Sequence, residues 1–156
     1  MERGIYCLAF ENPAAVLEVG RLDAVAFRPG YHCYIGSALG PGGLARVERH
    51  RRLGRDRDRS PHWHVDRLLL DPRFRIAAAV TAGTGERLEC ALARAVGGDA
   101  VVGLGATDCR CGSHLLFRPR DPVDEVAAAF RAIDLAPIVT RFKNDFEKAM
   151  VTDGED

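Results

Sequence analysis

Two short stretches near the N-terminus decide the fold: GIYCLAF at residues 4–10 and YHCYIGS at residues 31–37. Side chains alternate between the two faces of a strand, so Tyr6 and its alternates share one face while Ile5 and its alternates share the other. A Pro29-Gly30 turn directly precedes the second stretch. Both stretches are therefore expected to be strands of one sheet.

Further elements are expected around these two strands. The glycine-rich residues 40–43 should break the sheet, and a helix should follow over residues 44–53. Apolar spacing predicts a second helix over residues 86–96, with Thr84 as its N-cap. The other expected elements are strands at residues 16–19, 24–27, 74–81 and 114–118 and helices at residues 62–70 and 123–133. Together they predict a mixed α/β (α+β) fold, in which helices flank a small central, mostly antiparallel sheet.

The length and composition are those of one ordinary domain, with 156 residues and an apolar fraction of 47%. The charged fraction of 28% is close to the usual share, so disorder is not expected for the chain as a whole. No apolar run approaches the roughly 20 residues that span a bilayer, and the N-terminus lacks the apolar segment of a signal peptide. We therefore expect a cytoplasmic protein with no membrane partner, whose five cysteines do not need to form a disulfide framework.

The charges balance overall but are unevenly distributed. The chain has 22 basic and 22 acidic side chains, and seven of the arginines lie between Arg46 and Arg59. A concentrated basic patch has phosphate as its natural partner. A solvated helix face that continues into a charged loop explains the same charges equally well.

Four features along the chain suggest a common chemistry. They are the tripeptides Gly4-Ile5-Tyr6 and Tyr34-Ile35-Gly36, the pair Arg46 and His50, and Glu89 on the expected helix over residues 86–96. Arg46 and His50 are four residues apart and share one helical face. A guanidinium beside an imidazole suits phosphate binding combined with proton transfer. Without the tripeptides, an exposed arginine and histidine of a basic helix would be the preferred interpretation.

This order of residues resembles the GIY-YIG nuclease family, and both tripeptides match literally. Wider segments are similar to the small stand-alone Uri-type endonucleases, namely residues 30–38, 62–66 and 108–114. The resemblance covers residues 4–118, so a nuclease-like domain is expected over residues 1–118. Residues 119–156 are expected to be a helical extension of the same domain that ends in an acidic tail prone to disorder.

The resemblance implies a metal-dependent endonuclease that hydrolyses phosphodiester bonds, with Mg²⁺ or Mn²⁺ bound by Glu89. Tyr6 and Tyr34 would orient water or transfer protons, and Arg46 would stabilise the charged transition state. His50 is the expected base and Tyr6 the alternate, because an imidazole with a pKa of ~6.5 is easier to use at neutral pH than a phenol with a pKa of ~10. Ordinary strand packing is the competing explanation for both tyrosines.

The nucleic acid is expected to be DNA rather than RNA, and a double-strand break by this single catalytic domain would require a homodimer. Ser37 stands where many relatives carry a basic residue, which leaves one phosphate contact open. The asparagine that some relatives use after the glutamate has three candidate replacements: Asp108, Ser113 and His114. The expected substrate-binding residues are Gly36, Ser37, Arg49, Arg52, His62 and His64.

A zinc site is the less favoured use of the cysteines and histidines. Cys109, Cys111 and His114 could join His62 and His64, but the spacing is not that of the usual zinc knuckles. Two rival functions follow from these features. One is a nucleic-acid-binding module without catalysis, and the other is a zinc-stabilised interaction domain.

Overall fold

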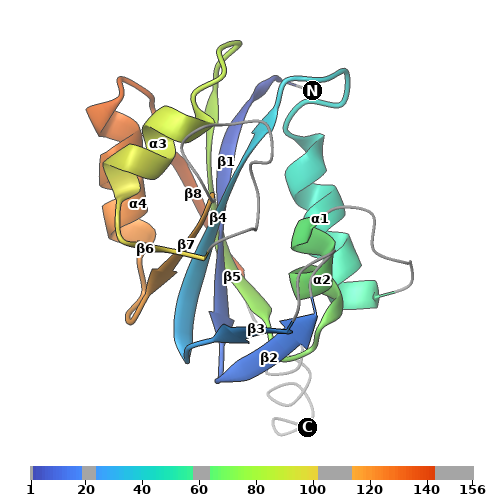
Figure 1. Cartoon of the computed structure of the whole chain (residues 1–156). Coiled ribbons are helices and arrows are strands. Elements are labelled where there is room, and N and C mark those ends of the chain that lie inside the picture. Colours follow the sequence, from blue (N-terminus) through green and yellow to red (C-terminus); the bar gives the residue numbers. More distant parts are fainter. Residues whose placement is uncertain (1, 19–23, 58–63, 102–113, 143–156) are drawn as a thin grey trace, which may run out of the picture.

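The structure, a computed structural model, describes residues 2–18, 24–57, 64–101 and 114–142 (Figure 1). Its elements follow one another in the order β1 (Gly4–Asn12), β2 (Ala15–Glu18), β3 (Ala24–Phe27), β4 (Gly30–Ala38), α1 (Ala45–Asp56), α2 (His64–Leu70), β5 (Arg75–Gly83), α3 (Glu89–Val96), β6 (Asp99–Ala100), β7 (Leu115–Arg118), α4 (Val123–Ala132) and β8 (Ile138–Arg141).

Six of these strands form one sheet in the order β6-β7-β4-β1-β5-β8, and β2 and β3 form a separate two-stranded hairpin. Each described pair of neighbouring strands is antiparallel. Strands β1 and β4, which contain the two tripeptides, are direct neighbours near the centre of the sheet. The predicted α+β class with a mostly antiparallel sheet is therefore confirmed.

Strand β1 is buried on both faces because both of its alternating sets are apolar. The face that carries Ile5 packs against α3 and α4, through residues such as Leu92 and Phe130. The face that carries Tyr6 packs against α1, α2 and the β2–β3 hairpin, through residues such as Leu69. Figure 1 shows the two helix pairs on opposite sides of the sheet, so the fold has three layers.

The predicted start of the helix over residues 86–96 is wrong. Thr84 does not cap it, because α3 begins only at Glu89. The Thr84 hydroxyl instead accepts the backbone N–H of Glu86 at 3.1 Å, which closes a local turn. Threonine hydroxyls form such turns as readily as helix caps, and the sequence alone does not separate the two.

Strands β6 and β8 were not predicted. Strand β6 has only two residues, too few for a pattern. Strand β8 follows α4 and pairs with β5 at the sheet edge, with all four of its residues exposed. An exposed edge strand lacks the alternation of apolar and polar residues by which strands are recognised.

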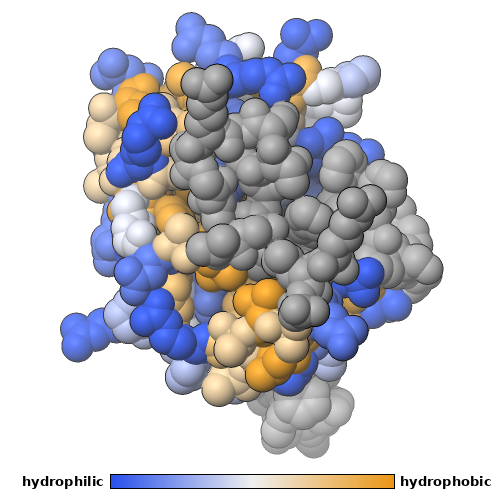
Figure 2. All heavy atoms as spheres, viewed as in Figure 1, coloured by the Kyte–Doolittle hydropathy of each residue, from blue (hydrophilic) through white to orange (hydrophobic). Residues whose placement is uncertain are grey.

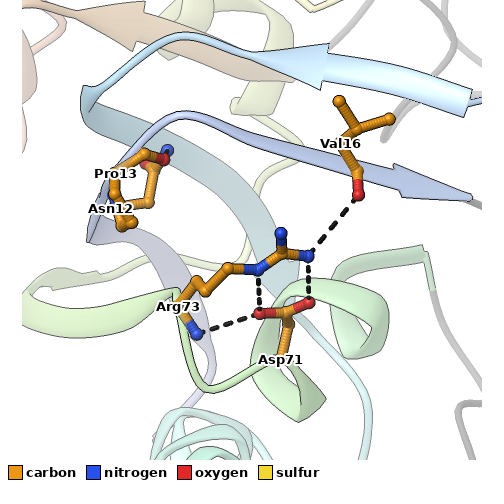
Figure 3. Close-up of polar contacts among 5 residues, drawn as sticks. All are labelled: Asn12, Pro13, Val16, Asp71 and Arg73. Carbon is orange, nitrogen blue, oxygen red and sulfur yellow. Dashed lines mark hydrogen bonds and ion pairs between the residues drawn. The ribbon is translucent and has the colours of Figure 1, made fainter.

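An arginine fork ties the turn after α2 to the β2–β3 hairpin (Figure 3). Arg73 donates through Nε and Nη2 to the two carboxylate oxygens of Asp71, at 2.9 and 2.8 Å. The same Nη2 reaches the backbone oxygen of Val16 at 3.5 Å. The hydrogen bonds from Arg73 hold the pKa of Asp71 below its usual value.

The surface carries a small apolar area over the β2–β3 hairpin, visible low on the face drawn in Figure 2. Val16 in β2 is 59% exposed and contributes to it. Within the four described ranges, no helix is long and apolar enough to cross a bilayer.

Candidate active site

Gly4 and Gly36, the glycines of the two tripeptides, each lie too close to a neighbouring residue to carry a side chain. A Cβ on Gly4 would collide with the carbonyl oxygen of Ala82 in β5. A Cβ on Gly36 would lie 2.6 Å from the hydroxyl oxygen of Tyr6 and 2.7 Å from its Cζ. Gly36 lies directly across from Tyr6 in the β1–β4 register, so its lack of a side chain makes room for the phenol.

Tyr6 and His50 form a buried pair at this point. The Tyr6 hydroxyl oxygen and His50 Nε2 are 3.1 Å apart, within hydrogen-bond distance. Only 2% of Tyr6 and 6% of His50 is exposed. The Tyr34 ring lies 6.3 Å from the Tyr6 ring, centroid to centroid, so both motif tyrosines line the same face of the sheet.

Burial keeps both members of the pair uncharged at neutral pH. It lowers the pKa of His50 to about 4, and the nearby positive charges of Arg46 and Arg49 add to this effect. Burial raises the pKa of Tyr6 well above its ordinary value, and Tyr34 adds to that shift. The pair therefore holds a neutral imidazole next to a protonated phenol.

Asp66 is a buried carboxylate that the sequence did not single out. It lies in the first turn of α2 and is 4% exposed. Its negative charge raises the pKa of His50 and opposes the effect of burial there, and it also raises the pKa of Tyr34. The available signal was an acidic residue in the first turn of a short helix that ends in three leucines, and it falls within a segment that carries the resemblance.

Arg46 and Glu89 meet at one residue, Ser37 near the end of β4. Arg46 donates from Nη1 to the backbone oxygen of Ser37 at 2.9 Å. The Ser37 hydroxyl donates to Glu89 Oε2 at 2.5 Å. Tyr6 and Arg46 belong to the α1 side of the sheet and Glu89 to the α3 side, so the site extends around the end of β4.

Glu89, the residue predicted to bind a metal, is partly buried at the start of α3. Its side chain is 17% exposed, and its Oε1 atom lies 4.0 Å from the exposed guanidinium of Arg87. One oxygen of this partly buried carboxylate is held by a hydroxyl, and the other lies beside an exposed guanidinium. Mg²⁺ usually keeps several waters and takes one or two carboxylates, so a cation that displaced Arg87 could use this oxygen. Among the residues that the structure describes, no three His, Cys, Asp or Glu side chains gather into a group that would hold a metal.

The proposed substrate-binding arginines lie on the exposed side of α1. Arg49 and Arg52 are both exposed and form no ion pair with the described residues. The Arg49 guanidinium lies above Gly42, where a Cβ would be 3.0 Å from Nη2. His62 and the side chain of His64 lie outside the described residues, as does Arg59.

The cysteines divide into two groups. Cys7 and Cys33 are buried and free. Cys90 is disulfide-bonded, which was not predicted, and its Sγ lies 3.5 Å from Nε2 of the buried His114. Cys109 and Cys111, on which the zinc alternative depends, lie outside the described residues, as do Asp108 and Ser113.

One protein-family model matches most of the chain. The family described as "Domain of unknown function DUF123" matches residues 5–135. The chain belongs to the DUF123 family. The match runs from β1 through α4, so it includes each side chain discussed here. No curated protein and no solved structure gives a significant match to this DUF123 chain.

Proposed function

We propose that the protein is a divalent-metal-dependent endonuclease that hydrolyses phosphodiester bonds of nucleic acid, with DNA as the favoured substrate. One observation carries the proposal: Arg46 and Glu89 converge on Ser37, next to the buried pair of Tyr6 and His50. A cation, a carboxylate and a proton acceptor at one place are the groups that phosphodiester hydrolysis requires.

The proton path runs from water through Tyr6 to His50. In the tautomer that carries its proton on Nδ1, the neutral imidazole has a lone pair at Nε2, and the Tyr6 hydroxyl lies within hydrogen-bond distance of it. As water attacks phosphorus, its proton passes to the phenol oxygen while the phenol proton passes to Nε2. The negative charge of Asp66 favours the imidazolium that forms. In this arrangement His50 and Tyr6 act as one unit, and neither has to lose a proton before the reaction.

Arg46 acts on the phosphate. The Ser37 backbone oxygen accepts a hydrogen bond from its Nη1, and a hydrogen bond from Arg46 to the Tyr6 phenol partly offsets the rise in the Tyr6 pKa. A guanidinium has five N–H donors, so donors remain for phosphoryl oxygens. Fixed donors aimed at developing charge are usually the largest single contribution to such catalysis. Arg49 and Arg52, exposed on the same helix, would contact the phosphates on either side.

Glu89 would hold the metal through the oxygen that Ser37 leaves open. The bound ion would supply positive charge to the phosphoryl group and to the leaving oxygen. Glu89 would place the charge of the metal on the α3 side of β4, whereas Tyr6 and His50, the proton acceptors, lie on the α1 side. This separation matches an in-line displacement, in which the attacking and leaving oxygens lie on opposite sides of phosphorus.

A binding module without catalysis is the second candidate. It would use the arginines of α1 in the same way but would not require the Tyr6–His50 pair or the contact between Ser37 and Glu89. Polar groups in such arrangements are costly to bury and are found mainly at functional sites. The geometry therefore favours the enzyme.

The test is cleavage of end-labelled single-stranded and duplex DNA and RNA with Mg²⁺, Mn²⁺ or EDTA. We expect cutting that requires metal and that is abolished in Arg46→Ala but retained in Arg94→Ala, the control, which changes an exposed arginine in the last turn of α3. Binding without cutting in every metal would refute the enzyme and favour the binding module. Stoichiometric zinc in the purified protein, without cutting, would favour the zinc-stabilised domain.

A further inference from the structure

We propose that Ser37 is a positioning residue that sets the metal affinity of the site by holding Glu89, an inference that rests on the proposed function. The sequence pointed to Ser37 as a substrate contact. In the structure both of its polar groups are already engaged within the protein, the hydroxyl by Glu89 and the backbone oxygen by Arg46.

The Ser37 hydroxyl fixes one oxygen of the carboxylate. It donates to Oε2 of Glu89 at 2.5 Å, and both side chains are partly buried. Glu89 is the first residue of α3, and its side chain is 17% exposed. Its Oε1 atom lies 4.0 Å from Arg87 Nη1, so the bond from Ser37 to Oε2 is the shorter of the two contacts that orient the carboxylate. An oriented carboxylate loses less conformational freedom when it binds a cation, and outer partners of metal ligands are worth about 10- to 100-fold in metal affinity.

A hydroxyl at this position also leaves the charge of Glu89 intact. A basic side chain at residue 37 would form an ion pair with the carboxylate and compete with a cation for it. Serine orients the carboxylate without adding a second positive charge beside Arg87, whose Nη1 lies 4.0 Å from Glu89 Oε1. Arg46 is bound to the Ser37 backbone oxygen and lies on the α1 side of the strand.

The two contacts of Ser37 can be separated by mutation. Ser37→Ala removes the hydroxyl but keeps the backbone oxygen that binds Arg46. Ser37→Thr keeps the hydroxyl, and threonine suits a strand position. Thr140→Ala is the matched control, since Thr140 is an exposed strand residue in β8 at the far edge of the sheet.

The experiment measures Mn²⁺ binding to the intact protein by calorimetry and by the electron paramagnetic resonance of free Mn²⁺, so that no cleavage is needed. We expect Ser37→Ala to weaken Mn²⁺ binding about 10-fold or more, Ser37→Thr to restore most of it, and Thr140→Ala to match the wild type. In cleavage assays the Ser37→Ala defect should shrink as Mg²⁺ is raised, with KM for nucleic acid unchanged.

The outcomes separate this inference from the proposed function. Wild-type binding that Glu89→Gln abolishes but Ser37→Ala leaves unchanged would overturn the role of Ser37 and leave the nuclease standing. A raised KM for nucleic acid in Ser37→Ala, with Mn²⁺ binding unchanged, would assign the hydroxyl to substrate instead. A wild-type protein that binds no Mn²⁺ would overturn both.

Discussion

Replacement of Gly36 by alanine tests the packing that holds the buried pair of Tyr6 and His50 together. The new Cβ would lie 2.6 Å from the Tyr6 hydroxyl oxygen and 2.7 Å from Cζ. The phenol cannot easily move away, because Tyr6 is 2% exposed and its ring packs 5.7 Å from that of His50 and 6.3 Å from that of Tyr34.

The size of the effect follows from two opposing contributions. Alanine in place of glycine in a strand lowers the entropy of the unfolded chain and would stabilise the protein by about 0.5–1 kcal/mol if it fitted. Overpacking a buried site costs about 1–3 kcal/mol, and the rigid phenol places this site toward the upper end. We therefore expect Gly36→Ala to lower the free energy of unfolding by about 1–2 kcal/mol.

The assay is chemical denaturation followed by circular dichroism, with Gly40→Ala as the control. A Cβ on Gly40 meets nothing within 4 Å, so this substitution should be neutral or slightly stabilising. A Gly36→Ala protein as stable as the wild type, or more stable, would show that Tyr6 does not lie against Gly36 and would refute this description of the site.

Three further predictions concern the buried histidines, Arg46 and Tyr6. Burial lowers the pKa of both His50 and His32 from 6.5 to about 4, so the stability from keeping each one neutral is complete above pH 6.5 and is lost as the pH falls towards 4. The lowered pKa of each histidine should reduce the free energy of unfolding by about 2 kcal/mol as the pH falls from 7 to 5. Unfolding measured at these two pH values should show a smaller loss of stability in His32→Gln than in the wild type. Arg46→Lys keeps the charge but loses the planar fork, so single-turnover cleavage should fall about 100-fold; equal rates would remove Arg46 from the mechanism. Tyr6→Phe removes the hydroxyl that links water to His50 and should slow cleavage by about 100-fold or more, whereas an unchanged rate would show that the proton leaves by another path.

The sheet centre and the order of the elements could be predicted because they depend on local patterns. The apolar residues of β1 and the turn before β4 identified both strands, the glycine-rich break identified the start of α1, and the apolar spacing identified α3 within a few residues. Strand β8 carries no such pattern, since its position depends on pairing with β5 rather than on its own residues.

The candidate site residues could be chosen from the sequence, but the contacts between them could not. The tripeptides and their order pointed to Tyr6, Arg46 and Glu89, and the structure brings the last two together at Ser37. The contacts of Ser37 and the burial of Asp66 depend on how α3 and α2 dock on opposite faces of the sheet. Sequence spacing does not specify such docking, because it depends on the packing of residues distant in the chain.

The most direct test of the nuclease is single-turnover cleavage of one defined oligonucleotide by the wild type, Glu89→Gln and Glu86→Gln in saturating Mg²⁺. Glu86 is an exposed glutamate three residues before Glu89 and is the matched control. The account predicts cleavage by the wild type and by Glu86→Gln, and a loss of about 100-fold or more in Glu89→Gln, which keeps the shape of the side chain but removes its charge. Equal cleavage by all three proteins, or none by the wild type, would contradict it.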